Sequence, residues 1–140
     1  MTATFLNPDD VHAPAGPYSH TAVVPPGSEL VFVAGQVGMR PDGSVPDDFA
    51  EQAELAFRNL RACLAAQGLG VTDVVKLGVF LVPGQDFAAL RAVRERHFGA
   101  HRPTSTTVYV PQLATPALLV EVDAVAVKRA PASADGGEAR

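Results

Sequence analysis

The stretch DFAEQAELAFRNLRACLAAQGLGVTDVVKLGVFLV, residues 48–82, joins a helix signal to a strand signal. Asp48 is an N-cap residue type with Glu51 three positions later, which predicts the start of a helix. Apolar residues recur there at steps of three and four, as in a helix that packs by one face. They are Phe49, Ala53, Ala56, Phe57, Leu60 and Leu64. Gly68 ends the helix, and the apolar run 74–82 predicts a strand in the middle of a sheet.

The segments on either side complete a mixed α+β domain. Residues 20–24 and 29–35 are rich in valine and are separated by a PPGS turn, which predicts an antiparallel hairpin. Asp86 is placed to cap a second amphipathic helix that Gly99 ends. Two final strands are expected at 105–110 and 118–127. The order is therefore two or three strands, helix, strand, helix and two strands, and the two helices can cover only one face of the sheet.

The last strand indicates what happens on the uncovered face. In LLVEVDAVAV, residues 118–127, apolar residues occupy both alternating sets, so both faces of the sheet are substantially apolar. Exposing such a face to water costs about 25 cal/mol per Å². We therefore expect a homo-oligomer in which Glu121 and Asp123, on one side of this strand, lie in or beside the subunit interface.

Length and composition favour one small domain. With 140 residues and 47% hydrophobic content, we expect a short extension at 1–12, a single domain at 13–129 and a disordered tail at 130–140. The net charge is -4 and there is no basic cluster, which argues against nucleic acid as a partner. No apolar run has the roughly 18–20 residues that a membrane-spanning helix needs, so no membrane association is expected.

Cysteine and histidine usage bears on metals and location. Cys63 is the only cysteine, which excludes an internal disulfide and any site built from several thiolates. We expect it to be a buried structural thiol in a cytoplasmic protein. His97 and His101 lack the spacing of metal ligands, and no metal is predicted.

The stretch HRPTSTTVYV, residues 101–110, has an unusual pattern for a strand. One side carries the hydroxyl groups of Ser105, Thr107 and Tyr109. From alternation alone this side is either a water-facing sheet surface or the wall of a site.

Several stretches together resemble one known family. They are APAGPYSHTAVV, LVFVAGQVG, residues 48–81, DFAALRAVRERHFG and RPTSTTVYVPQLATPALLVEVDAVAV. In this order, over residues 13–128, the chain resembles the RidA/YjgF/YER057c/UK114 family of reactive-intermediate deaminases. The resemblance implies a chorismate-mutase-like fold, a homotrimer with clefts between subunits, and hydrolysis of small enamines or imines without metal or organic cofactor.

The same resemblance implies roles for individual residues. Tyr18 matches a tyrosine that lines the cleft, and Gly35 a glycine whose backbone meets the ligand. Phe87 and Thr107 match positions close to the ligand. Glu121 matches the acidic residue that orients or activates the attacking water.

One position departs from the family pattern. Ser105 stands where the family has an arginine that grips the substrate carboxylate, and a neutral hydroxyl cannot form that bidentate ion pair. The substrate is therefore expected to be atypical, with Ser105, Tyr18 and Thr107 hydrogen-bonding the ligand. Arg91, on the second helix, is a candidate replacement guanidinium, although a charged helix that also holds Arg94 and Arg96 is more often a solvated face.

For three other candidate residues, the sequence leaves both a functional and a structural interpretation open. Glu121 is either a general acid/base or an interface carboxylate, and Tyr18 either contacts a ligand or packs at a wet edge. His20 either approaches the cleft or is structural. Three functions follow: an imine or enamine hydrolase, a non-catalytic module that binds a small metabolite or a protein partner, and a specialised biosynthetic enzyme on the same fold.

Overall fold

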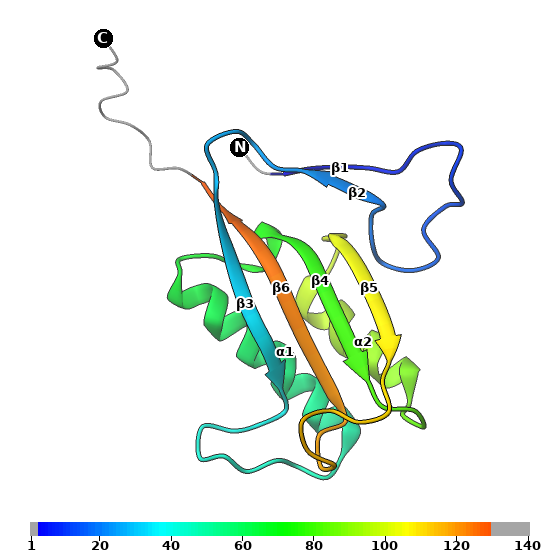
Figure 1. The fold of residues 1–140 in the computed structure, drawn as a ribbon, viewed down its shortest axis with the longest axis vertical. Coiled ribbons are helices and arrows are strands. Elements are labelled where there is room, and N and C mark those ends of the chain that lie inside the picture. Colours follow the sequence, from blue (N-terminus) through cyan, green and yellow to red (C-terminus); the bar gives the residue numbers. More distant parts are fainter. Residues whose placement is uncertain (1–2, 130–140) are drawn as a thin grey trace.

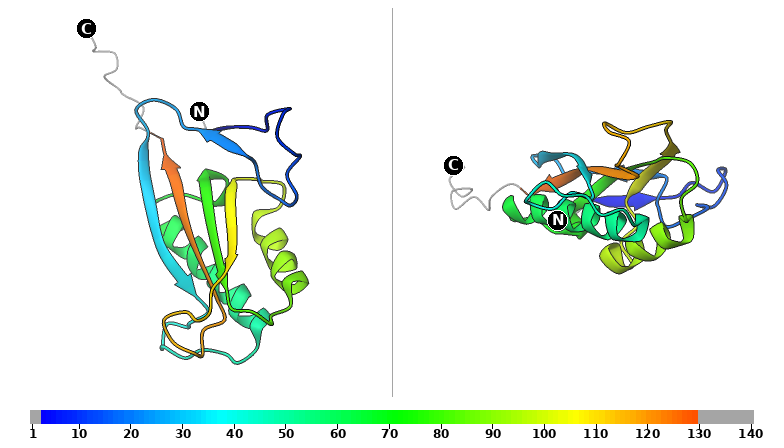
Figure 2. Two further views of the ribbon diagram at one scale, coloured as in Figure 1. Left: turned by 45° about the vertical axis from the view of Figure 1, so that its right-hand side comes forward. Right: turned by 90° about the horizontal axis from the view of Figure 1, so that it is seen from below.

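A mixed four-stranded sheet with two helices on one face forms the body of the molecule (Figures 1 and 2). The computed structural model describes residues 3–129, so the expected tail at 130–140 lies outside the described residues. The elements are β1 (Thr4–Leu6), β2 (Thr21–Val23), β3 (Glu29–Val37), α1 (Phe49–Ala66), a short 3-10 turn (Val71–Asp73), β4 (Val74–Leu81), α2 (Phe87–Phe98), β5 (Thr104–Tyr109) and β6 (Val120–Lys128). The expected α+β fold class is confirmed.

Both helices begin where their caps predict. The Asp48 carboxylate accepts a hydrogen bond from the Glu51 backbone N–H at 3.0 Å, and α1 starts at the next residue. The Asp86 carboxylate accepts from the N–H groups of Ala88 and Ala89, at 3.0 and 3.2 Å, at the start of α2. These bonds satisfy donors that the first turn of a helix leaves free.

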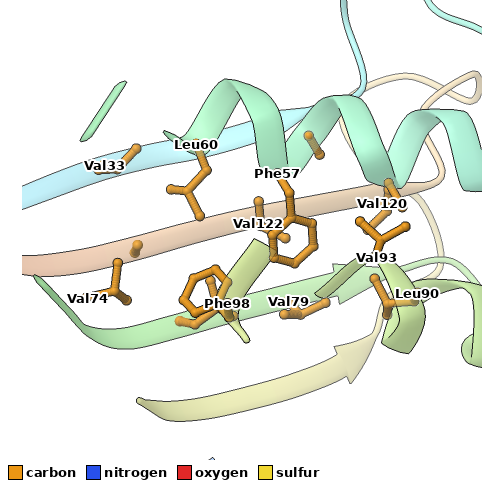
Figure 3. Close-up of a cluster of buried hydrophobic side chains, with 14 of the residues drawn as sticks. Val33, Phe57, Leu60, Val74, Val79, Leu90, Val93, Phe98, Val120 and Val122 are labelled. Carbon is orange, nitrogen blue, oxygen red and sulfur yellow. The ribbon is translucent and has the colours of Figure 1, made fainter. Parts of the chain in front are cut away.

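The core lies between α1 and the sheet (Figure 3). Phe57, Leu60 and Leu64 of α1 are fully buried, and Val122 of β6 is buried within the same cluster. Cys63 is half-buried at the edge of this core. The apolar stripe predicted along the helix is therefore the surface that fixes α1 on the sheet.

The sheet order is β3-β6-β4-β5, with β4 and β5 parallel and the other neighbours antiparallel. The hairpin predicted from 20–24 and 29–35 is wrong: both strands exist, but β2 pairs with β1 and β3 pairs with β6. Figure 1 shows β2 crossing the end of the sheet, away from the edge of β3. A turn signal predicts that two strands are separate but does not choose their partners, and the longer β6 supplies the ladder for β3.

The face opposite the helices carries large apolar side chains. Phe32 and Leu30 of β3 are 73% and 49% exposed. Figure 2 shows both helices on one side of the sheet and neither on the other. This face is the one for which the sequence predicted contact with further subunits.

Candidate functional site

A cleft of about 500 Å³ lies between the segment before β2, helix α2 and strand β5. It collects five of the seven residues that the sequence singled out: Tyr18, Phe87, Arg91, Ser105 and Thr107. Its volume falls within the range of small-molecule sites, about 300–1,000 Å³. Among the described residues, its lining includes no Asp or Glu.

Strand register places the hydroxyl groups of β5 in this cleft. Ser105 pairs with Leu77 and Thr107 with Val79, and both partners on β4 are buried under the helices. Since paired residues in neighbouring strands point to the same face, Ser105 and Thr107 point to the helix side. There they line the cleft, whereas Tyr109 further along is 56% exposed. The hydroxyl side of this strand is thus partly a site wall.

The segment that carries Tyr18 is fixed to the start of β5. The Ser19 backbone N–H donates to the Pro103 carbonyl at 3.1 Å, and the Ser19 hydroxyl donates to the Arg102 carbonyl at 2.6 Å. The Tyr18 hydroxyl accepts from the Ala15 N–H at 3.2 Å. This local bond holds the phenol at the rim of the cleft.

Two histidines extend the same wall. His20 Nε2 lies 2.7 Å from the His12 carbonyl oxygen, so this nitrogen donates, and the two rings meet edge to face at 5.0 Å. His20 therefore both lines the cleft and holds the chain, which unites the two readings open at the sequence level. His12 was not predicted, because an isolated histidine in an irregular segment carries no periodic signal.

The sequence also missed Arg94, the most deeply buried charged residue of the cleft. Only 8% of it is exposed. Its Nη1 donates to the Ser105 hydroxyl oxygen at 3.2 Å, and its Nη2 donates to the Pro17 carbonyl at 2.8 Å. Its Nε is buried without a hydrogen-bond partner. The view of α2 as a solvated charged face is therefore wrong for Arg94.

Burial sets the charge properties of this guanidinium. Desolvation, followed by the positive charges of Arg102 and Arg91, lowers the pKa of Arg94 to about 10, against a partial opposing effect of Glu95. Arg94 is still a cation at neutral pH. Arg91 differs: it is exposed at the cleft rim, with its guanidinium 5.6 Å from the centre of the Phe87 ring.

The remaining two predicted residues lie on the other side of the sheet. Glu121 pairs with Phe80 between the buried neighbours Val120 and Val122, so it points away from the helices. Its carboxylate lies directly over Gly35, where an added Cβ would overlap it. Gly35 and Glu121 thus contact each other but do not line the cleft that holds the other five residues.

Comparison with known proteins identifies the family. The sequence profile described as Endoribonuclease L-PSP matches residues 10–128. The chain belongs to this family, also called RidA/YjgF. The expected family resemblance is confirmed.

Relatives of this RidA/YjgF chain have names that bear on chemistry. TdcF of Escherichia coli, named a putative reactive intermediate deaminase, is 37% identical over 72% of this chain and 81% of its own length. A protein of Dermatophagoides farinae named 2-iminobutanoate/2-iminopropanoate deaminase is 34% identical, over 81% of this chain and 88% of its own.

Solved structures agree with the fold. A Rid-family protein of Yersinia pestis superposes with a TM-score of 0.79 at 27% identity, covering 90% of this chain and 98% of its own. TdcF with bound serine gives a TM-score of 0.67 at 32% identity, covering 89% and 98%. Deaminase-like activity is thus supported at the level of the RidA/YjgF family.

Residues 3–129 contain neither a metal-binding cluster nor a membrane-spanning helix. Within them, no group of three or more His, Cys, Asp or Glu side chains is arranged to hold a metal ion. No helix in the same range has the length and apolar content to cross a bilayer.

Proposed function

We propose that the protein hydrolyses small imines or enamines in clefts between the subunits of a homotrimer. The single observation that carries the proposal is the division of the predicted site between two faces of the sheet. Five residues converge on the cleft, while Glu121 lies over Gly35 on the opposite face, the face that also carries the exposed Phe32. Packing that face against a neighbour covers its apolar side chains and brings the carboxylate of one subunit to the cleft of the next.

The chemistry needs few groups. Water adds to the carbon of a C=N bond, a carbinolamine forms, and its collapse gives a carbonyl and ammonia. Glu121 would take a proton from the attacking water and return it to the leaving nitrogen, in the manner of a general base and then a general acid. Tyr18 and Thr107 would hydrogen-bond the ligand, and the apolar walls would limit access of bulk water. No metal or organic cofactor takes part in this scheme.

Hydrolysis of RNA is the rival suggested by the family description. The chain carries a net charge of -4, and Arg96 and Arg102, which follow the two cleft arginines in the sequence, are paired with Glu54 and Glu95. A phosphate backbone is bound by several cations in a row. Composition therefore favours a small substrate over a nucleic acid.

A non-catalytic binding module is the second candidate. It is favoured by the cleft of one subunit, whose lining among the described residues holds two arginines but no carboxylate to move protons. The two candidates differ in whether Glu121 of a neighbour reaches the bound ligand.

The test is hydrolysis of 2-imino acids that an amino-acid oxidase generates in situ, with semicarbazide as a trap for the imine. Glu121→Gln should lower the rate by about 100-fold or more, the range of general acid/base catalysis. Asp123→Asn is the matched control, because Asp123 lies on the same strand and face and covers Gly78 as Glu121 covers Gly35. No acceleration by the wild-type protein would favour the binding module.

Subunit mixing tests the shared site. Thr107→Trp fills the cleft, and Glu121→Gln removes the acid, so each variant alone should be inactive. If cleft and acid come from different subunits, refolding an equal mixture should restore about a quarter of the wild-type rate, since one neighbour pair in four combines both intact halves. If one subunit contained the whole site, mixing would restore nothing.

A further inference from the structure

Arg94 is a buried cation to which the described protein gives no counter-ion. It lies on α2 one turn after Leu90, on the side of the helix that faces the sheet, and is 8% exposed. None of the four salt bridges found among residues 3–129 includes it. Its two protein acceptors, the Ser105 hydroxyl and the Pro17 carbonyl, are both neutral. Burying a charge in this way is costly unless a partner compensates it.

The hydrogen-bonding capacity of the group is also incomplete. A guanidinium has five N–H donors. Two of them are assigned to Ser105 and Pro17, so three remain, including the buried Nε–H that has no acceptor. A planar guanidinium that is held at two points and has free donors is suited to receive a carboxylate through parallel hydrogen bonds.

The surroundings select for a small anion. Arg91 adds a second positive charge at the rim, and the cleft lining described here contains no acidic residue, although the whole chain has a net charge of -4. Phe87, Leu90 and Val79 contribute apolar walls to a volume of about 500 Å³. A short-chain carboxylate matches this combination of one charged end and a limited apolar space.

We propose that Arg94, supplied by helix α2, is the residue that binds a carboxylate of the ligand, and that Ser105 is its positioning residue. The hydroxyl of Ser105 leaves room for the Arg94 side chain and accepts one of its N–H groups. The arginine expected at position 105 is in this way replaced by one from a different element. The inference rests on the proposed function, because it assumes that the cleft holds a small molecule.

The experiment separates a ligand-binding role from a structural one by varying the charge of both partners. Binding of 2-oxobutanoate, an imine hydrolysis product, and of its neutral amide 2-oxobutanamide is measured by calorimetry on the purified full-length protein. Arg94→Gln should weaken 2-oxobutanoate about 10-fold or more, the range for a hydrogen bond to a charged group, and the amide by less than about 3-fold. Arg94→Lys should fall between wild type and Arg94→Gln, since it keeps the charge without the planar fork.

The control is Arg96→Gln, which removes an equal charge two residues along the same helix, where Arg96 pairs with Glu54 outside the cleft. It should leave both affinities within about 2-fold, because the effect of an exposed charge is screened. Circular dichroism and thermal melts establish that each variant is folded. A loss of affinity that is equal for acid and amide, or that follows Arg91→Gln instead of Arg94→Gln, would overturn the proposal.

The binding and hydrolysis measurements can fail independently, so they test the role of Arg94 separately from the hydrolase activity. Charge-dependent binding that needs Arg94, with no acceleration of imine hydrolysis, supports the role of Arg94 and rejects the hydrolase. Hydrolysis that proceeds equally with Arg94→Gln rejects the role of Arg94 and leaves the hydrolase intact.

Discussion

Helices α1 and α2 cover the same face of the sheet, and each buries one polar side chain. The two side chains differ in whether all their hydrogen-bonding groups have partners. Gln52 of α1 is fully buried; its amide donates to the Pro46 and Ala117 carbonyls at 2.9 and 2.8 Å, and its carbonyl accepts from the Leu119 N–H at 2.9 Å. Arg94 of α2 is buried with one nitrogen unpartnered and no counter-ion among the described residues. A buried polar group with all its hydrogen bonds made stabilises a fold, whereas an unsatisfied one requires an explanation, and for Arg94 the proposed explanation is a bound carboxylate.

The largest effect is expected on the α1 side. Gln52→Ala should lower the free energy of unfolding by about 3 kcal/mol, because it removes three hydrogen bonds and leaves buried backbone groups unpaired. Urea denaturation at fixed protein concentration measures this. Asn59→Ala is the control, since Asn59 also donates to two backbone carbonyls but is only half-buried, and about 1 kcal/mol is expected. If both variants lost the same free energy of unfolding, full burial of Gln52 would not make its hydrogen bonds more stabilising than those of Asn59.

Ser105→Arg should have the next largest effect on stability. A second guanidinium beside Arg94 repels it and displaces it from its acceptors, which should cost about 1–2 kcal/mol of stability and weaken carboxylate binding. The double variant Ser105→Arg/Arg94→Ser moves the arginine from α2 to β5 and should recover both quantities. If Ser105→Arg alone improves binding of 2-oxobutanoate, the side chain at 105 was the missing clamp and Arg94 was not acting as one.

Arg94→Met should change stability by about 1 kcal/mol at most in either direction. The variant loses two hydrogen bonds but also removes the cost of burying a charge without a counter-ion, so the two effects oppose each other. The same urea titration used for Gln52→Ala checks it. A loss as large as that of Gln52→Ala would make Arg94 a structural residue of the same kind.

The distance along the chain over which an interaction acts explains which features the sequence could predict. The two helix starts were predictable because Asp48 and Asp86 act on backbone groups within three residues, as the caps show. The hairpin was mispredicted because partner choice is non-local: nothing within residues 20–35 encodes that β3 will pair with β6. Local patterns fix elements, and long-range packing fixes their neighbours.

The candidate site was predictable to a similar degree. Family resemblance placed five residues that the structure brings into one cleft, but the separation of Glu121 from Ser105 by the sheet depends on a register that one strand does not reveal. Arg94 was overlooked because charged residues are ordinarily exposed. Two features of the sequence could have identified Arg94. It lies four residues after the apolar Leu90 on the same helix, and position 105 holds a serine where an arginine is expected.

Glu54 links helix α1 to helix α2, and the pH dependence of its contribution to stability tests whether a charge that already has partners behaves differently from Arg94. Glu54 of α1 accepts from Arg96 at 3.0 Å and lies 2.8 Å from His97 Nε2, and the His97 ring stacks on Phe57 at 5.7 Å. Burial tends to raise the pKa of Glu54, but the hydrogen bonds from Arg96 and His97 outweigh it and hold the pKa below its ordinary value of 4.5. This carboxylate, unlike the Arg94 guanidinium, already has a counter-charge within the protein, that of Arg96.

The smallest effect is therefore expected from Glu54→Gln. Because the folded pKa lies below the unfolded one, the stabilisation by Glu54 is present above about pH 4.5 and is lost as the pH falls through the folded pKa. At pH 7 the variant should lose no more than about 1 kcal/mol, since a third of the side chain is exposed to solvent. Urea denaturation at pH 7 and near pH 3.5 should show the difference from wild type shrinking at the lower pH. A difference that stays constant would mean that the negative charge of Glu54 does not contribute to stability, in spite of its contact with Arg96.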